Sequence, residues 1–201
     1  MIPELNQLPV VVALAGSNGA GKSTFYGAHL RSTGLRFVNA DILARELGID
    51  AYRAAEIAGA LREKLLEQRE SFVFETVFSD PVGDKISFLQ RAAGAGYNVI
   101  LCFIGISDPA MSEERVTMRV TQGGHDVPAE KLATRFPRTL ENLRKSIRTL
   151  PHVIVFDNSD LSDPYRQIAI VHNGEADFLS KSLPVWLREI LKQASTNRAD
   201  I

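Results

Sequence analysis

Residues 10–24 read VVVALAGSNGAGKST, an apolar run that leads into a glycine-rich loop. The loop, Gly16-Ser17-Asn18-Gly19-Ala20-Gly21-Lys22-Ser23-Thr24, has the spacing GxxxxGK[ST]. Glycines let backbone N–H groups face phosphate oxygens, and the positive end of a following helix adds to the attraction. We therefore expect residues 16–24 to bind the phosphates of a nucleoside triphosphate, with Lys22 neutralising the terminal phosphates and the Ser23 hydroxyl as a ligand of Mg²⁺. Thr24 stands where a dinucleotide-binding loop has its third glycine or alanine, which argues against that class.

Short apolar runs recur along the rest of the chain, separated by stretches with helical periodicity. Strands are expected at residues 9–15, 36–39, 71–75, 98–105 and 152–156, with a sixth at 167–171. Helices are expected at residues 22–30, 51–68, 85–95, 113–121, 129–150 and 185–193. This alternation predicts a P-loop NTPase fold, an α/β three-layer sandwich with a mostly parallel central sheet and helices on both faces. We expect one domain over residues 1–201, with a frayed polar tail at 194–201.

The composition narrows the class of protein and its partners. The chain has 23 Lys and Arg against 24 Asp and Glu, so no overall positive field exists to attract nucleic acid or an anionic membrane. Cys102 is the one cysteine, which excludes an internal disulfide and a zinc site of several thiolates. The N-terminal apolar run is too short for a secretory signal or a membrane span. We expect a cytoplasmic protein without a membrane partner.

Two acidic residues follow expected strands at the edge where ligands of parallel sheets bind. Asp41 comes after the strand 36–39, where a kinase places the acid that orients an acceptor hydroxyl and takes its proton. Asp41 also fits the N-cap of a helix that begins near Ile42. Glu75 ends the strand 71–75 and is followed by Thr76, so this pair can hold substrate hydroxyls or a magnesium-bound water.

A third strand-end acid remains an alternative for the metal. Asp157 directly follows the apolar strand 152–156, as a Walker B aspartate does, but Asn158 comes next instead of a second acid. We rank Glu75 above Asp157 for substrate or metal. Asp157, Asn158 and Ser159 are expected to form a loop near the nucleotide base.

Four arginines flank a glycine-containing interruption at residues 122–128, Gln-Gly-Gly-His-Asp-Val-Pro. A planar guanidinium binds two phosphate oxygens at once, and kinases bring such groups over the site on a closing segment. Residues 112–138 are therefore expected to form a helical lid with a hinge at Gly123 and Gly124. The arginines that it would bring to the phosphates are Arg115, Arg119, Arg135 and Arg138.

Five segments in order resemble the zeta-toxin-like P-loop kinases, including the branch often labelled predicted ABC-type ATPase: GSNGAGKST, FVNADILA, FVFETVFS, RVTMRVTQGGHDVP and KLATRFPRTLENL. The resemblance covers roughly residues 9–160. It implies phosphate transfer from ATP or GTP, with Mg²⁺, to a sugar hydroxyl of UDP-N-acetylglucosamine, and an antitoxin protein as a partner. The chain has no LSGGQ-like segment, so the activity of a transporter ATPase is not expected.

The resemblance also implies roles for individual residues. Lys22 and Ser23 would bind the triphosphate and magnesium, and Asp41 would be the catalytic base. Arg119 and Arg135 would stabilise the transferred phosphate. The residues expected to contact the acceptor are Asn39, Glu75, Thr76 and Arg138.

The leading hypothesis is an ATP-dependent kinase that acts on a small hydroxyl compound such as a sugar nucleotide. One alternative is a nucleotide-dependent switch or partner-binding ATPase, but such a protein needs no cluster of arginines around the phosphates. Another is a polynucleotide 5′-hydroxyl kinase, but a net charge of -1 argues against the long basic groove that it needs. The choice between ATP and GTP stays open.

Overall fold

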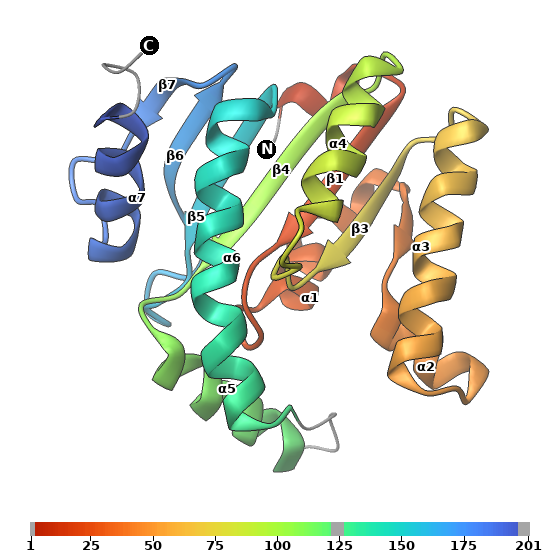
Figure 1. Cartoon of the computed structure of the whole chain (residues 1–201), viewed down its shortest axis with the longest axis horizontal. Coiled ribbons are helices and arrows are strands. Elements are labelled where there is room, and N and C mark those ends of the chain that lie inside the picture. The colour runs from red at the N-terminus through yellow and green to blue at the C-terminus, as the bar shows by residue number, and fades with distance from the viewer. Residues whose placement is uncertain (1–2, 122–126, 197–201) are drawn as a thin grey trace.

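The computed structural model describes residues 3–121 and 127–196 of the chain. One seven-stranded sheet, in the order β2-β3-β1-β4-β5-β6-β7, runs through these residues (Figure 1). The strands are β1 (Val10–Ala15), β2 (Arg36–Val38), β3 (Phe72–Thr76), β4 (Asn98–Gly105), β5 (His152–Asp157), β6 (Arg166–His172) and β7 (Glu175–Leu179). The pairs among β1 to β5 are parallel, and β6 and β7 are added antiparallel. The predicted α/β fold with a mostly parallel sheet is confirmed.

Helices cover both faces of the sheet. They are α1 (Lys22–Phe25), α2 (Ala40–Leu47), α3 (Ala51–Glu67), α4 (Asp84–Gly94), α5 (Pro109–Thr121), α6 (Ala129–Thr149) and α7 (Val185–Thr196). In Figure 1, α3, α4 and α6 lie in front of the sheet and α1 lies behind it. α1 continues as a π-helical turn, Tyr26–Leu30. Over the described part of the chain, no helix has both the length and the apolar character needed to cross a membrane.

The central strand β1 shows why the sheet needs helices on both sides. All six of its residues are buried, and successive side chains point to opposite faces. Val11, Ala13 and Ala15 belong to the hydrophobic core beneath α3, α4 and α6. Val10, Val12 and Leu14 belong to the second core, which includes Phe25 of α1. A strand that is apolar at every position is therefore buried on both faces.

The structure differs from the sequence-based expectations at β7, at the start of α5 and at the end of α7. A turn with positive φ at Asn173 and Gly174 follows β6 and leads into an additional strand, β7. All five residues of β7 are exposed, and the alternation of Ala176 and Phe178 with Glu175 and Asp177 is the one short local signal for this strand. α5 begins at Pro109, four residues before the expected start, and the Asp108 carboxylate accepts the Met111 N–H at 2.9 Å. α7 continues through Thr196, within the expected tail, and residues 197–201 lie outside the description.

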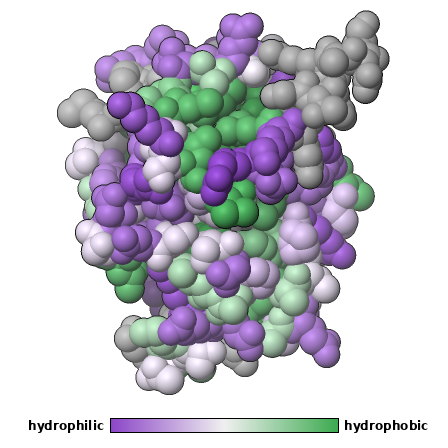
Figure 2. Space-filling view, turned by 90° about the vertical axis from the view of Figure 1, so that its left-hand side faces the viewer, coloured by the Kyte–Doolittle hydropathy of each residue, from purple (hydrophilic) through white to green (hydrophobic). Residues whose placement is uncertain are grey.

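The side of the molecule formed by β7 and α7 faces the viewer in Figure 2, which shows hydrophobic residues bordered by hydrophilic ones. Phe178 and Leu179 of β7 are 40% and 44% exposed. This side lies at the opposite end of the sheet from β2 and β3. It is therefore remote from the strands that carry Glu75 and lead into Asp41.

Trp186 packs α7 onto the sheet. The side chain is 8% exposed, and its ring lies 6.1 Å from that of Phe103, centroid to centroid. A Cβ at Gly105 would overlap carbon atoms of the indole ring. Gly105→Ala is therefore expected to lower the free energy of unfolding by about 1–3 kcal/mol, measured by chemical denaturation.

Gly94→Ala is the matched control for this prediction. Gly94 is the last residue of α4, and a Cβ there has no atom within 4 Å. Its stability should stay unchanged or rise slightly, because alanine is the better helix former. Equal stability of the two variants would contradict the close packing of Trp186 on Gly105.

Candidate functional site

The glycine-rich loop connects β1 to α1 and lies against the carboxyl end of β4. Gly16, Gly19 and Gly21 all have positive φ, at 148°, 72° and 91°. A Cβ at Gly16 would overlap the backbone carbonyl of Ile104 in β4. Glycine is therefore required at position 16 both by the backbone conformation and by the space available. A loop of this conformation at the start of a helix fits a phosphate group.

Lys22 begins α1 and lies inside this loop. Its side chain is 6% exposed, and its Nζ donates to the carbonyl oxygen of Ser17 at 3.0 Å. The Nζ also lies 3.8 Å from Oε1 of Glu75 in β3. The positive charge is thus held where the loop and the neighbouring strand meet.

Glu75 joins three parts of the expected site. Its Oε2 accepts a hydrogen bond from the Ser23 hydroxyl at 2.9 Å and another from Asn39 Nδ2 at 2.8 Å. β3 pairs directly with β1, so Glu75 stands beside Leu14 at the edge of the sheet that bears the loop. Neighbouring strand positions explain why residues that are far apart in the sequence meet here.

Asn39, rather than Asp41, caps α2. The Asn39 Oδ1 accepts the backbone N–H of Ile42 at 3.1 Å, while its Nδ2 bonds Glu75. Asp41 lies in the first turn of α2 and is exposed. The alternative of Asp41 as an N-cap is therefore wrong, because the preceding strand ends one residue earlier than expected, at Val38, and places Asn39 at the helix start. The Asp41 carboxylate is not used for capping.

A cavity of about 230 Å³ opens between α2, α3, β3 and the start of α4. It brings together Asp41, Asn39, Glu75 and Thr76, four of the residues expected at the acceptor. Its lining consists of Asn39, Ala40, Asp41, Ala55, Ala58, Arg62, Glu75, Thr76, Val77 and Lys85. We call it the acceptor cavity. Because Glu75 also bonds Ser23, the cavity adjoins the glycine-rich loop.

A second cavity, of about 380 Å³, adjoins the acceptor cavity and shares Thr76, Val77 and Lys85 with it. Arg135 and Arg138 of α6 line this second cavity. The two expected lid arginines of α6 thus lie on the acceptor side of the site.

Two side chains of α6 hold that helix against the segment that follows β3. Thr139 Oγ1 donates to the Val77 carbonyl at 3.1 Å. Asn142 Nδ2 donates to the carbonyls of Phe78 and Asp80, at 3.0 and 2.9 Å. Thr139 and Asn142 are buried, and as polar residues on the core-facing side of an amphipathic helix they carried a signal that the sequence analysis did not use.

The first half of α5 lies against the glycine-rich loop. Ser112 Oγ donates to the Asn18 carbonyl at 2.7 Å, and a Cβ at Gly19 would stand 3.1 Å from Cβ of Arg115. Arg119 belongs to α5, but its side chain lies outside the described residues. The expected hinge at Gly123 and Gly124 lies outside them as well.

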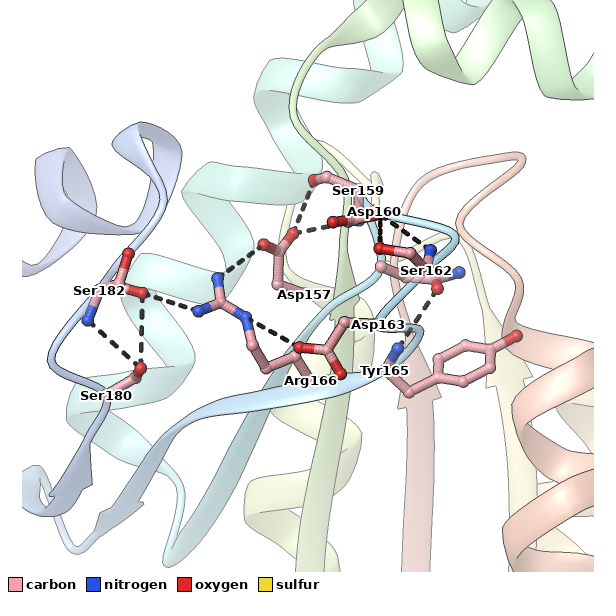
Figure 3. Close-up of polar contacts among 10 residues, drawn as sticks. Asp157, Ser159, Asp160, Ser162, Asp163, Tyr165, Arg166, Ser180 and Ser182 are labelled. Carbon is pink, nitrogen blue, oxygen red and sulfur yellow. Dashed lines mark hydrogen bonds and ion pairs between the residues drawn. The ribbon is translucent and has the colours of Figure 1, made fainter.

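Asp157 is bonded to Arg166 and Ser159. Its Oδ2 pairs with the Arg166 guanidinium at 3.3 Å, and its Oδ1 accepts the Ser159 hydroxyl at 2.6 Å (Figure 3). Arg166 also donates to the Ser182 carbonyl at 3.2 Å. Of the two acids left open for the metal by the sequence, Glu75 is the one bonded to the loop serine.

Asn158 and Tyr165 support the glycine-rich loop from the side of β5 and β6. Asn158 Nδ2 donates to the Ala20 carbonyl at 2.9 Å, and the Tyr165 hydroxyl donates to the Gly21 carbonyl at 3.0 Å. Burial is the main reason that the pKa of Tyr165 is raised. The sequence placed Asn158 near the nucleotide, but it had no signal for Tyr165.

The oxygen atoms around Ser23 fit a magnesium ion that is shared with phosphates. A serine hydroxyl beside a carboxylate is the hard donor set that Mg²⁺ prefers. The described residues contain no group of three or more His, Cys, Asp or Glu side chains that could hold a metal ion. The fit therefore depends on oxygen atoms of a bound triphosphate completing the set, as in P-loop proteins.

Comparisons with solved structures give the same architecture. The chain resembles AvrRxo1-ORF1:-ORF2 in its crystal structure with ATP, at a TM-score of 0.69 and 19% identity, over 94% of this chain and 64% of that one. It also resembles a structure from the PezAT chromosomal toxin-antitoxin system of Streptococcus pneumoniae, at a TM-score of 0.59 and 15% identity, over 96% of this chain and 87% of that one. The chain thus spans slightly less than two thirds of the length of the first. At these identities the likeness shows the fold. A search of the curated proteins gave no match.

The zeta toxin family matches residues 51–168, which is more than half of the chain. The matched region contains Glu75, Arg62 and Lys85, and both α5 and α6, whereas the glycine-rich loop and Asp41 precede it. The match confirms the resemblance in the three segments that it covers, FVFETVFS, RVTMRVTQGGHDVP and KLATRFPRTLENL. The chain belongs to the zeta toxin family.

Proposed function

We propose that this protein is an ATP-dependent kinase that transfers the γ-phosphate to a hydroxyl group of a small molecule, with UDP-N-acetylglucosamine or a related sugar nucleotide as the acceptor. The observation that carries the proposal is the position of Glu75. This residue bonds Ser23 of the glycine-rich loop and at the same time lines the cavity that contains Asp41. A donor phosphate and an acceptor hydroxyl would therefore meet at one place.

Asp41 is proposed as the base. No described residue forms a hydrogen bond or ion pair with its carboxylate, so both oxygens are available to an acceptor. As the acceptor oxygen bonds to the γ-phosphorus, the bond from phosphorus to the β–γ bridging oxygen breaks and ADP leaves with that electron pair. The hydroxyl proton goes to the Asp41 carboxylate.

The remaining residues are proposed to position and neutralise the phosphates. Lys22 and the loop 16–24 would hold the triphosphate. Ser23, which is hydrogen-bonded to Glu75, would hold the magnesium ion. A bound magnesium ion would neutralise charge on the β- and γ-phosphates. We propose Arg119 and Arg135 for the transferred phosphoryl group, as the family resemblance implies. The residues proposed to contact the acceptor are Asn39, Glu75, Thr76 and Arg138.

The two adjoining cavities support a sugar nucleotide as the acceptor. Together they form a longer space than the acceptor cavity alone, and Lys85, Arg135 and Arg138 line its second part. Such basic groups suit the diphosphate of a sugar nucleotide. The structural likeness to a protein of the PezAT toxin-antitoxin system supports the further proposal that an antitoxin protein binds this chain. An ATP-dependent activity also agrees with the expected cytoplasmic location.

The proposal is tested by incubating the protein with ATP, Mg²⁺ and a panel of sugar nucleotides, followed by mass spectrometry. We expect a product heavier by one phosphate. The proposal fails if protein that is shown to bind ATP yields no such product. Hydrolysis without an acceptor that changes strongly with a protein partner would instead indicate a switch, and labelled phosphate on a 5′-hydroxyl oligonucleotide would indicate a polynucleotide kinase.

Glu75→Gln is expected to raise the Mg²⁺ concentration that gives half the maximal rate by about tenfold or more. The substitution removes the charge beside Ser23 while keeping a side chain of similar size. Substitutions of residues that hydrogen-bond a metal ligand commonly lower the metal affinity by this order. Asp157→Asn is the matched control, because Asp157 pairs with Arg166 instead. A shift in the Asp157→Asn protein and none in the Glu75→Gln protein would reverse our assignment of these two acids.

A further inference from the structure

Arg62 of α3 brings a half-buried cation to the acceptor cavity. Its guanidinium carbon lies over the rings of Phe74 and Phe88, at 5.1 and 5.7 Å from their centroids. Its Nε is buried and has no hydrogen-bond partner. In residues 3–121 and 127–196, no carboxylate forms an ion pair with this guanidinium. A buried donor without an acceptor is costly, so the position of Arg62 calls for an explanation beyond packing.

Arg91 on α4 is a hydrogen-bonded arginine that lies over one of the same aromatic rings, that of Phe88. Its guanidinium carbon also lies 5.7 Å from the Phe88 centroid, but it forms two hydrogen bonds to Glu63, at 2.6 and 3.2 Å. Glu63 is the next residue after Arg62, yet it is bonded to Arg91. Burial lowers the pKa of Arg62, and the nearby Glu63 charge offsets this effect in part. Arg62 therefore carries a charge that is partly removed from water, and no described residue is bonded to it, although the carboxylates of Asp41 and Glu75 line the same cavity.

Lys85 provides a second cation on the same side of the cavity. It lies in the first turn of α4, lines both the acceptor cavity and the adjoining one, and has no ion pair with any described residue. Glu75 on β3 also lines the cavity, but its Oε2 already accepts hydrogen bonds from Ser23 and Asn39. Two cations from α3 and α4 thus border the acceptor cavity without a bonded anion.

We propose that Arg62 and Lys85 form an anion-binding site in the acceptor cavity, which selects acceptors that carry a phosphate or carboxylate group. This inference rests on the proposed function and deepens it, because it assigns the recognition of the acceptor's charge to two residues. The Arg62 guanidinium would bind two oxygens of the anion, and the Lys85 ammonium would add a third contact. Contact with the rings of Phe74 and Phe88 holds the guanidinium in place for this purpose.

The test measures binding by isothermal titration calorimetry in protein saturated with a nonhydrolysable ATP analogue and Mg²⁺, so that the glycine-rich loop is occupied. The probes are UDP, glucose 1-phosphate, gluconate and uncharged glucose. We expect binding of at least one charged probe that exceeds the binding of glucose. Binding of UDP or glucose 1-phosphate alone would assign the site to phosphates, whereas binding of gluconate alone would assign it to carboxylates. Both results support the anion site.

Arg62→Met should weaken the binding of the charged probe by about tenfold or more, because hydrogen bonds to a charged group are lost. Affinity for the ATP analogue should stay within about twofold, since Arg62 does not line the glycine-rich loop. Arg91→Met is the matched control, because it also removes a guanidinium from Phe88, and it should leave the binding of the probe unchanged.

The free energy of unfolding gives a second test, because a purely structural role of Arg62 predicts a loss of stability in the Arg62→Met protein. If Arg62 is kept for an anion, the nucleotide-free Arg62→Met protein should be at least as stable as the unaltered protein, because a half-buried charge without a bonded partner has been removed. If Arg62→Met does not fold, Arg62→Gln serves for the same binding measurement. The inference is overturned if no charged probe binds the nucleotide-loaded protein, or if the folded variants bind the probe as tightly as the unaltered protein. None of these measurements requires phosphoryl transfer, so their failure is distinguishable from failure of the proposed kinase activity.

Discussion

Asp41→Asn should lower kcat for phosphoryl transfer by about 100-fold or more, while the affinity for ATP changes by less than about threefold. The amide keeps the size and polarity of the side chain but cannot accept the hydroxyl proton. Asp41 lines the acceptor cavity, and Asn39 provides the cap of α2, so the substitution leaves the helix start intact. Steady-state kinetics with the accepted sugar nucleotide would give kcat, and calorimetry with a nonhydrolysable analogue would give the affinity.

Glu46→Gln is a suitable control for this experiment. Glu46 lies on the same helix as Asp41 and is exposed, but it does not line either cavity. Its kcat should equal that of the unaltered protein. An unchanged kcat in the Asp41→Asn protein would remove Asp41 from the role of base.

Gly16→Ala is expected to have the largest effect on nucleotide binding. The φ of 148° at Gly16 is one that residues with a Cβ rarely adopt, and the new methyl group would overlap the Ile104 carbonyl. The strain and the overlap should together lower the free energy of unfolding by roughly 2–5 kcal/mol. Relief of the overlap requires the loop to move away from β4, so affinity for ATP should fall by more than about tenfold, because the backbone N–H groups would no longer face the phosphates.

Gly27→Ala tests whether these losses belong to the loop. Gly27 lies in the π-helical turn after α1, and a Cβ there meets no atom within 4 Å. Both stability and ATP affinity should stay close to those of the unaltered protein. Chemical denaturation and calorimetry measure the two quantities, and a Gly16→Ala protein that behaves like the Gly27→Ala protein would contradict the tight fit of the loop against β4.

The parts of the fold that the sequence predicted well depend on local patterns. β1 is apolar at six successive positions because it is buried on both faces, and the loop after it has a fixed spacing of glycines. By contrast, β7 has five exposed residues, and its only role in the sheet is to pair with β6. Only the short alternation Glu175-Ala176-Asp177-Phe178 marks this strand, so its presence depends mainly on pairing with β6.

The candidate site was predictable where the parallel strands end, and less so where helices contribute. Glu75 could be placed at the sheet edge from its strand alone, but its bonds to Ser23 and Asn39 depend on the order of β2, β3 and β1. Arg62 was missed although a signal existed. It follows Ala58 by four residues and precedes Leu65 by three, which places a charge on the buried face of α3.

The central claim is that donor and acceptor meet between the glycine-rich loop and Asp41. A crystal structure with a nonhydrolysable ATP analogue, Mg²⁺ and UDP-N-acetylglucosamine tests it most directly. We expect the triphosphate on residues 16–24 and the sugar in the acceptor cavity, with one hydroxyl within hydrogen-bond distance of the Asp41 carboxylate and directed at the γ-phosphate. A sugar nucleotide bound elsewhere, or an Asp41 carboxylate turned away from the γ-phosphate, would contradict it.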